Sequence, residues 1–372
     1  MKKILTVIGT RPEAIKLCPL VLELKSRPDQ FESIVCLTGQ HREMLDQVME
    51  TFGIKAEFDL NIMSPGQSLA QVTARATTGL DEVIGQAKPD VVIVQGDTTT
   101  AFCGALAGFY HQVPVAHVEA GLRTGNKKAP FPEEANRCLI GQLAEWHFPP
   151  TQMSQQALLN EGVPSERAIV TGNTVIDALL WIRDRVEQNT PALPEGLEAW
   201  LDGKLVVLVT GHRRESFGGG FENLCSAIRE VADAHDNVGF VYPMHLNPNV
   251  REPVSRILGE HERIKLIEPL SYEPFVWLMN RSTIVFTDSG GVQEEAPSLG
   301  KPVLVMRETT ERPEGVEAGN AKLVGVDKQL IMSELNTLLS DEAARQAMAD
   351  IRNPYGDGTA SKQICDVLAG LE

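Results

Sequence analysis

The 372-residue chain lacks the hydrophobic run that a membrane helix needs, and it has too little positive charge to attract polyanions. No apolar stretch approaches the roughly 18 residues of a membrane span, and Arg11 and Glu13 end the first apolar run too early for a signal peptide. With 34 Lys and Arg against 50 Asp and Glu, the net charge of −16 repels nucleic-acid backbones and anionic membranes. We therefore expect a cytoplasmic protein whose partners include neither nucleic acid nor membrane.

Several signatures of metal, redox and nucleotide chemistry are also missing. The six cysteines are scattered without a C-x-x-C pair, which argues against a zinc ribbon or a dithiol redox site. The chain has no H-E-x-x-H, no D-x-D, no G-x-S-x-G and no P-loop. Arg11 and Pro12 stand where a dinucleotide-binding loop would have glycines. We expect no cofactor and no metal, so Arg, Lys, His and backbone amides must bind any phosphate.

The sequence does contain an alternation of short apolar, β-branched runs with helix-length segments. Such strands, separated by helices, indicate parallel sheets that helices cover on both faces. A segment at 187–203, with Pro191 and Pro194, interrupts the alternation, which then restarts. The sequence thus predicts an α/β protein with two Rossmann-like, doubly wound domains facing across a cleft. Strands are expected at 4–8, 33–37, 91–95, 115–118, 168–171, 205–210, 239–242, 264–267, 284–287, 303–306 and 321–324.

Unusual residues follow the ends of the strands expected in the first half. In open α/β sheets, ligands bind beyond the carboxyl ends of the strands. Arg11 and Lys16 offer two cations to a phosphate at a helix N-terminus, although both also fit a solvated first helical turn. Glu119 ends an apolar strand, where a carboxylate is costly unless it is paired or used. Taken alone, Asp97 or Thr98 fits the cap of the helix that follows, and Glu133 fits an acidic residue in the first turn of another helix.

The second half places other anion-binding groups at equivalent positions. His212 and two arginines follow the strand expected at 205–210, and together they can hold an anion. Ser289, Gly290 and Gly291 join a strand to a helix, so free backbone amides and the helix dipole can bind a diphosphate. Glu295, one turn into that helix, can accept hydrogen bonds from the two ribose hydroxyls.

Longer motifs run through the chain in order. They are GTRPE at 9–13, GDTT at 96–99, HVEAGLR at 117–123, PEEANR at 132–137, TGNT at 171–174, HRRE at 212–215, HLNP at 245–248, DSGGVQEE at 288–295 and ERPE at 311–314. Together they resemble the non-hydrolysing bacterial UDP-N-acetylglucosamine 2-epimerases, essentially from end to end. The resemblance implies the GT-B-type glycosyltransferase fold, with one domain at 1–171 plus 355–372 and the other at 172–354.

The resemblance also implies a reaction, the reversible conversion of UDP-N-acetylglucosamine to UDP-N-acetylmannosamine. In this family the C2 proton is removed, UDP leaves by anti elimination, and UDP then adds back to a 2-acetamidoglucal intermediate. The product would supply N-acetylmannosamine units for surface polysaccharide. The expected partners are UDP-N-acetylglucosamine and a second copy of the chain in a homodimer.

Site residues follow from the matching motifs. The catalytic residues implied by the resemblance are Asp97, Glu119, Glu133 and His212. The substrate-binding residues are Arg11, Lys16, Arg137, Phe275, Ser289, Gly290, Gly291, Glu295 and Arg312. UDP-N-acetylglucosamine also activates several family members at a second site, and the residues that match it are Gln40, His41, Glu43 and His245. Gln95 stands where many relatives have His.

Other readings of the same residues remain open. A glycosyltransferase of the same fold would also bind a UDP-sugar, but it needs only one base and an acceptor groove, whereas three carboxylates favour epimerisation. A hydrolysing relative would usually carry a kinase domain, which the sequence does not show. A non-catalytic nucleotide-sugar sensor would be expected to lose the carboxylates, and all three are present.

Overall fold

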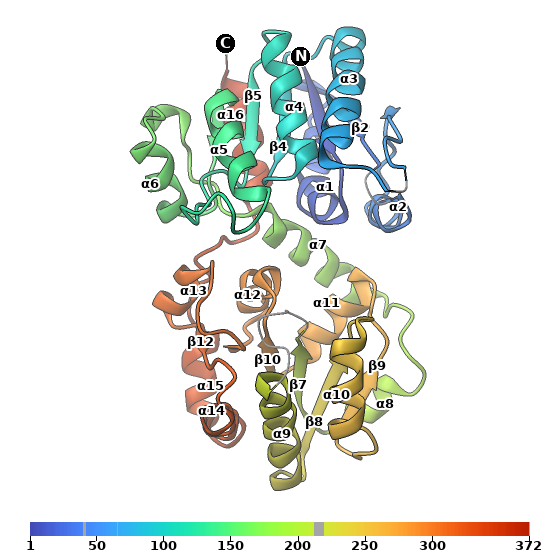
Figure 1. The fold of residues 1–372 in the computed structure, drawn as a ribbon, viewed down its shortest axis with the longest axis vertical. Coiled ribbons are helices and arrows are strands. Elements are labelled where there is room, and N and C mark those ends of the chain that lie inside the picture. The colour runs from blue at the N-terminus through green and yellow to red at the C-terminus, as the bar shows by residue number, and fades with distance from the viewer. Residues whose placement is uncertain (40–41, 65, 212–218, 372) are drawn as a thin grey trace. The chain divides into compact units, whose positions relative to one another are not determined.

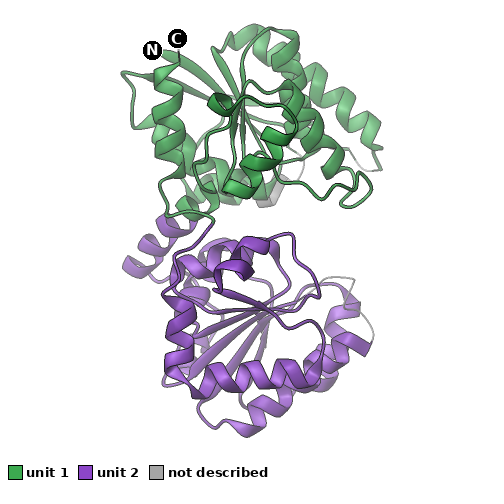
Figure 2. Ribbon diagram, turned by 90° about the vertical axis from the view of Figure 1, so that its left-hand side faces the viewer, with its two compact units in different colours: residues 1–178, 355–372 green, residues 179–354 purple. Residues whose placement is uncertain are grey.

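The computed structural model describes residues 1–39, 42–64, 66–211 and 219–371, with only the backbone at 42–44. The chain forms two compact units, residues 1–178 with 355–372 and residues 179–354 (Figures 1 and 2). The first crossing between the units falls inside helix α7 (Thr174–Gln188), and the second falls between Pro354 and Tyr355. The sequence-based boundary after residue 171 lies just before this helix.

The first unit is built on a six-stranded parallel sheet in the order β3-β2-β1-β4-β5-β6. Its strands are β1 (Lys2–Ile8), β2 (Phe31–Leu37), β3 (Phe58–Asp59), β4 (Val91–Gln95), β5 (Val115–Val118) and β6 (Trp146–Phe148). Its helices are α1 (Arg11–Lys25), α2 (Arg42–Thr51), α3 (Leu69–Ala87), α4 (Thr99–Tyr110), α5 (Glu133–Leu143), α6 (Gln152–Asn160), the start of α7 and the C-terminal α16 (Ala360–Gly370). Leu5 and Val7 pack with residues of α3 and α4, while Ile4 and Ile8 are buried on the opposite face.

The second unit has a six-stranded parallel sheet in the order β12-β11-β10-β7-β8-β9. Its strands are β7 (Leu205–Thr210), β8 (Val238–Pro243), β9 (Ile264–Ile267), β10 (Ile284–Thr287), β11 (Val303–Val305) and β12 (Ala321–Leu323). Its helices are the rest of α7, α8 (Leu197–Leu201), α9 (Gly219–Ala234), α10 (Pro248–Leu258), α11 (Tyr272–Arg281), α12 (Gly290–Glu295), α13 (Pro313–Ala318), α14 (Lys328–Ser340) and α15 (Glu342–Ala349). The predicted pair of doubly wound α/β sheets is thus confirmed.

Both sheets have the same topology, which determines where ligands can bind. In each unit the first strand of the sheet lies between the second and the fourth strands, so the winding reverses at β1/β4 and at β7/β10. Ligands of doubly wound sheets bind beyond the carboxyl ends of the strands at such a switch point. The loops at these positions begin at Gly9 and Gly96 in the first unit, and at Gly211 and Asp288 in the second.

One expected strand is wrong. Residues 168–171 form no strand, and Ala168 makes only an isolated bridge to His147. Strand β6 instead occupies the edge position of the sheet. Its three residues include a buried histidine, so its sequence shows no continuous apolar run. None of the helices in the described ranges has both the length and the apolar character needed to cross a membrane.

Candidate active site

Glu119 follows β5 and lies among three side-chain donors. Its backbone has a φ of +59°, a left-handed conformation that a non-glycine residue adopts at a cost. The Lys16 ammonium nitrogen lies 2.7 Å from Oε1 and 2.6 Å from Oε2. The Gln95 amide donates to Oε2, and the Asn173 amide donates to Oε1 at 3.3 Å. Residues from α1, β4 and the loop before α7 therefore fix the position of this carboxylate.

Asp97 follows β4 and forms an ion pair instead of capping the next helix. Thr98 supplies the cap of α4, because its hydroxyl accepts the backbone N–H of Ala101 at 3.0 Å. The Asp97 carboxylate accepts from Nη2 of Arg137 at 2.5 Å and from Nε at 3.1 Å. Arg137 is buried and also donates to Glu134 at 3.1 Å. The carboxylate is thus held by the guanidinium from α5.

Glu133 is the first residue of α5 and is half-buried. Its Oε2 atom is buried, and no residue in the described part of the chain is within hydrogen-bonding distance of it. Burying a carboxylate oxygen without a donor is costly, so a purely structural role at the helix start does not account for this oxygen. Asp97 and Glu119 directly follow the neighbouring strands β4 and β5, and Glu133 begins the helix to which the loop after β5 leads.

Glu13, which the sequence interpretation did not single out, joins two of these loops. The side chain is 1% exposed, and its Oε2 accepts the Gly9 N–H at 3.1 Å and the Thr10 hydroxyl at 2.7 Å. Its Oε1 accepts the Thr98 hydroxyl at 2.7 Å. The loop after β1 is therefore bonded to the loop after β4. The spacing Thr10-x-x-Glu13 is that of a helix capping box and was the available signal.

His117 holds the start of the loop after β4, which also contains Asp97. Its Nε2 lies 2.7 Å from the Gly96 carbonyl oxygen, and since that oxygen only accepts, Nε2 must carry the proton. Burial, with repulsion from His147 as a smaller cause, lowers the pKa of His117 to about 3. Burial likewise lowers the pKa of His147 to about 4. Both rings are therefore neutral at physiological pH, and His117 acts as a neutral donor that orients Gly96.

Glu13 should make the stability of the protein depend on pH. Burial raises its pKa from 4.5 to about 7, even though its hydrogen bonds oppose that change. The folded state then binds the proton more tightly than the unfolded state, so this contribution to stability is complete below pH 4.5 and is lost as the pH rises through 7. At about 1.4 kcal/mol per pKa unit, the loss is about 3 kcal/mol.

The Glu13→Gln variant isolates this effect, because its side chain does not titrate. Urea unfolding of both proteins from pH 4.5 to 8 should give a wild-type free energy of unfolding that falls by about 3 kcal/mol relative to the variant. The buried histidines affect both proteins equally and cancel in the difference. A difference that stays constant over this range would contradict the raised pKa.

In the second unit, the turn between β10 and α12 leaves open space around its glycines. A Cβ atom built on Gly290 would have no described atom within 4 Å, and one on Gly291 would meet only Glu295, at 3.9 Å. The protein's own packing therefore does not require glycine at these two positions. Glycine does allow a ligand to approach the backbone closely. Ser289, just before them, donates its N–H to Thr287 at 2.9 Å.

Side chains from α11 and from the loop before α13 hold the end of α12. The Tyr272 hydroxyl donates to Glu295 at 2.6 Å, and Glu295 is 6% exposed. Arg312 donates to the buried Glu294, and the Thr310 hydroxyl donates to the Gln293 side-chain oxygen at 2.7 Å. Tyr272 was missed by sequence reasoning, since no motif contains it. These contacts fix both acidic side chains of the helix.

The remaining sequence-predicted residues are spread over both units. Arg11 begins α1 and is half-buried, and Phe275 is half-buried in α11. His245 is exposed, and its Nδ1 accepts the N–H of Asn247 at 3.1 Å. Those that lie outside the described residues are Gln40, His41 and His212, together with the side chain of Glu43.

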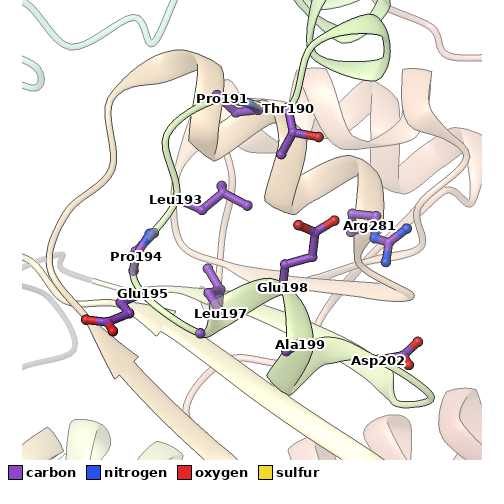
Figure 3. A pocket seen from close by; sticks show the side chains of 11 residues that line it. Thr190, Pro191, Leu193, Pro194, Glu195, Leu197, Glu198, Ala199, Asp202 and Arg281 are labelled. Carbon is purple, nitrogen blue, oxygen red and sulfur yellow. The ribbon is translucent and has the colours of Figure 1, made fainter.

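A cavity of about 680 Å³ in the second unit contains none of the expected residues (Figure 3). Its wall includes the acidic side chains Glu195, Glu198 and Asp202 and a single cation, Arg281. Excess negative charge disfavours a diphosphate there. No cluster of three or more His, Cys, Asp or Glu suited to a metal ion occurs in the ranges that the structure describes.

The chain is similar to known proteins over nearly its whole length. A family model described as UDP-N-acetylglucosamine 2-epimerase matches residues 22–369. Proteins of that name from Salmonella typhimurium and Escherichia coli K12 are each 57% identical to this chain, with 98% of both chains covered. The crystal structure of UDP-GlcNAc 2-epimerase from Neisseria meningitidis bound to UDP-GlcNAc is 50% identical and has a TM-score of 0.87. That match covers 98% of this chain and 99% of the other, and it bears out the expected GT-B-type fold.

Proposed function

Since the chain belongs to the UDP-N-acetylglucosamine 2-epimerase family, we propose that it interconverts UDP-N-acetylglucosamine and UDP-N-acetylmannosamine by elimination and re-addition of UDP. A base takes the C2 proton while the C1–O bond breaks. The electron pair of the C1–O bond leaves with UDP, in an anti elimination. The C1=C2 double bond of 2-acetamidoglucal forms at the same time. UDP then adds back to C1 as a proton is delivered to the other face of C2, so no atom is gained or lost overall.

The observation that most strongly supports this proposal is the grouping of three carboxylates on the loops of one sheet. Removing and returning a proton on opposite faces of C2 needs at least two positioned acid–base groups. Asp97, Glu119 and Glu133 supply these groups, and His212 is proposed to assist them. Arg137 donates to Asp97 and to Glu134, so within the proposal it positions Asp97 beside the substrate.

The proposal assigns the nucleotide to the second unit. Ser289 and the amides of Gly290 and Gly291 would bind the diphosphate, and Glu295, oriented by Tyr272, would accept the ribose hydroxyls. Phe275 would contact the uracil, and Arg312 the phosphates or the sugar. On the first unit, Arg11 and Lys16 would stabilise the charge that develops on the departing UDP.

The proposal also includes an allosteric activator, a homodimer and a use for the product. UDP-N-acetylglucosamine would also act as an allosteric activator through Gln40, His41, Glu43 and His245. The protein would form a homodimer, and the exposed side chains of Phe109 and Tyr110 at the end of α4 offer it an apolar surface. The product would serve the synthesis of surface polysaccharide.

Incubation of the protein with UDP-N-acetylglucosamine alone in D₂O tests the proposed reaction. We expect deuterium at C2 and resonances of both epimers by ¹H NMR, because a C2 proton removed to an enzymic base exchanges with solvent. A glycosyltransferase would leave C2 protonated until an acceptor is added, and a sensor would bind the sugar nucleotide without exchange. Absence of C2 exchange in folded protein that binds UDP would refute the proposal.

A further inference from the structure

Asn173 is a buried residue whose side-chain amide and backbone N–H form hydrogen bonds to different parts of the first unit. It lies just before α7 and is 1% exposed. Its side-chain oxygen accepts the Val175 N–H at 3.1 Å, and its side-chain nitrogen donates to Glu119 at 3.3 Å. Its backbone N–H donates to the Tyr355 carbonyl at 2.7 Å. The residue therefore connects a helix start, the candidate carboxylate and the returning C-terminal segment.

These partners determine the orientation of the amide. The backbone N–H of Val175 can only donate, so it requires the Asn173 oxygen. The Glu119 carboxylate accepts, so it requires the nitrogen. Turning the amide over would place a donor against a donor and an oxygen against an oxygen. The sequence Thr171-Gly172-Asn173-Thr174 thus presents a neutral donor to Glu119 in one fixed direction.

The chain segment that follows the second unit, around Tyr355 and Gly356, packs against the residues next to Asn173. A Cβ atom on Gly172 would lie 3.2 Å from the Cα of Gly356, so the two backbones are in close contact there. The Asp177 carboxylate accepts the N–H groups of Ala360 at 3.2 Å and Ser361 at 2.7 Å. The start of α7 is therefore hydrogen-bonded to the start of α16.

We propose that Asn173 is a positioning residue for Glu119 and that the returning segment around Tyr355 keeps it in place. The inference rests on the proposed function, in which Glu119 transfers a proton. Glu119 has a left-handed backbone, and Lys16, its charged partner, is a flexible amine that contacts both oxygens. A short side chain, fixed by the Val175 N–H at its oxygen and by Tyr355 at its backbone, restricts the direction of Oε1, as proton transfer to a defined face of a sugar requires.

The described contacts of Glu119 include one charged group and one titratable ring. Lys16 reaches it from α1, and His117, on β5 itself, feels its charge. Gln95 and Asn173 contribute neutral donors from β4 and from the start of α7. A negative charge introduced at position 173 would replace the neutral donor that lies 3.3 Å from Oε1, and it would repel the Glu119 carboxylate.

Two substitutions separate the positioning role of Asn173 from its role in the helix. Asn173→Ser keeps an N-cap acceptor for Val175 but is too short to reach Glu119. Asn173→Asp keeps both the cap and the size, and it replaces the donor with a negative charge. Asp327→Asn, an exchange at the exposed N-cap of α14, serves as the matched control. UDP affinity of all variants is measured by calorimetry.

We expect Asn173→Ser to lower kcat by about 10- to 100-fold, with KM and UDP affinity within about threefold of wild type. In Asn173→Asp, the pKa of Glu119 should rise by at least about 1 unit, because a neighbouring negative charge disfavours ionisation. This shift is read without substrate by ¹³C NMR of the Glu119 carboxyl, assigned with a Glu119→Gln spectrum. The matching limb of the pH profile of kcat should move to higher pH.

The two readouts distinguish the inference from the function on which it rests. Asn173→Ser with kcat within twofold of wild type would overturn the positioning role, even if its melting temperature falls. An unshifted Glu119 resonance in Asn173→Asp would also overturn it, whatever the activity. A wild-type protein without C2 exchange would instead refute the proposed function, while the NMR shift would still decide whether Asn173 acts on Glu119.

Discussion

Glu119→Gln should reduce C2 exchange by at least about 1,000-fold while leaving UDP binding within a fewfold of wild type. A glutamine has the shape of glutamate but neither takes nor gives a proton, and a positioned acid–base group contributes about 100- to 10,000-fold to rate. The proposed nucleotide residues Ser289 and Glu295 belong to the second unit, whereas Glu119 belongs to the first. The expected result is thus a loss of chemistry without a loss of nucleotide affinity, read by NMR in D₂O and by calorimetry with UDP.

A control is needed because the substitution also breaks an ion pair. The side chains of Lys16 and Glu119 are 16% and 8% exposed, so part of any effect could come from an unpaired ammonium group. Glu161→Gln breaks a comparable pair with Arg123 in the same unit, where both bonds measure 2.7 Å. This control should retain exchange within about threefold. Substantial exchange by folded Glu119→Gln would remove Glu119 from the set of catalytic residues.

Much of the fold could be predicted because parallel strands that are buried on both faces appear as unbroken apolar runs. The strand expected at 91–95 has the same bounds as β4, and the one at 284–287 the same as β10. The pattern fails at the two edges of the first sheet. Strand β3 has two residues and β6 has three, which are too few to form a recognisable apolar run. Ala168 looked like a strand residue because the segment around it is apolar, but it pairs only once.

The positions of site residues could be predicted, but their partners could not. Asp97 and Glu119 each follow an apolar run, so the sequence alone puts them at the carboxyl edge of a sheet. That Arg137 binds Asp97, or that Asn173 reaches Glu119, depends on how loops 40 and 54 residues apart come together. Local reasoning also left open whether Asp97 or Thr98 caps α4. The structure selects Thr98 and leaves the Asp97 carboxylate available to Arg137.

Arg137 holds two carboxylates whose charges would otherwise be unbalanced. Its side chain is 5% exposed, and its partner Glu134 is 2% exposed. Glu134 also accepts backbone N–H groups from Thr124, at 3.1 Å, and from Gly125, at 2.9 Å. The pair therefore fixes both the loop at 124–125 and the start of α5. Because Asp97 shares the same guanidinium, the buried network connects the stability of α5 to the proposed active site.

Arg137→Met should lower the free energy of unfolding by about 3–5 kcal/mol at pH 7, because removing one partner leaves a buried carboxylate without its counter-ion. Arg167→Met, which breaks an exposed pair with Glu145, should cost at most about 1 kcal/mol. Urea unfolding of both variants at pH 7 measures the two losses. A loss below about 1 kcal/mol for Arg137→Met would show that Glu134 is adequately held by the backbone N–H groups of the 124–125 loop alone.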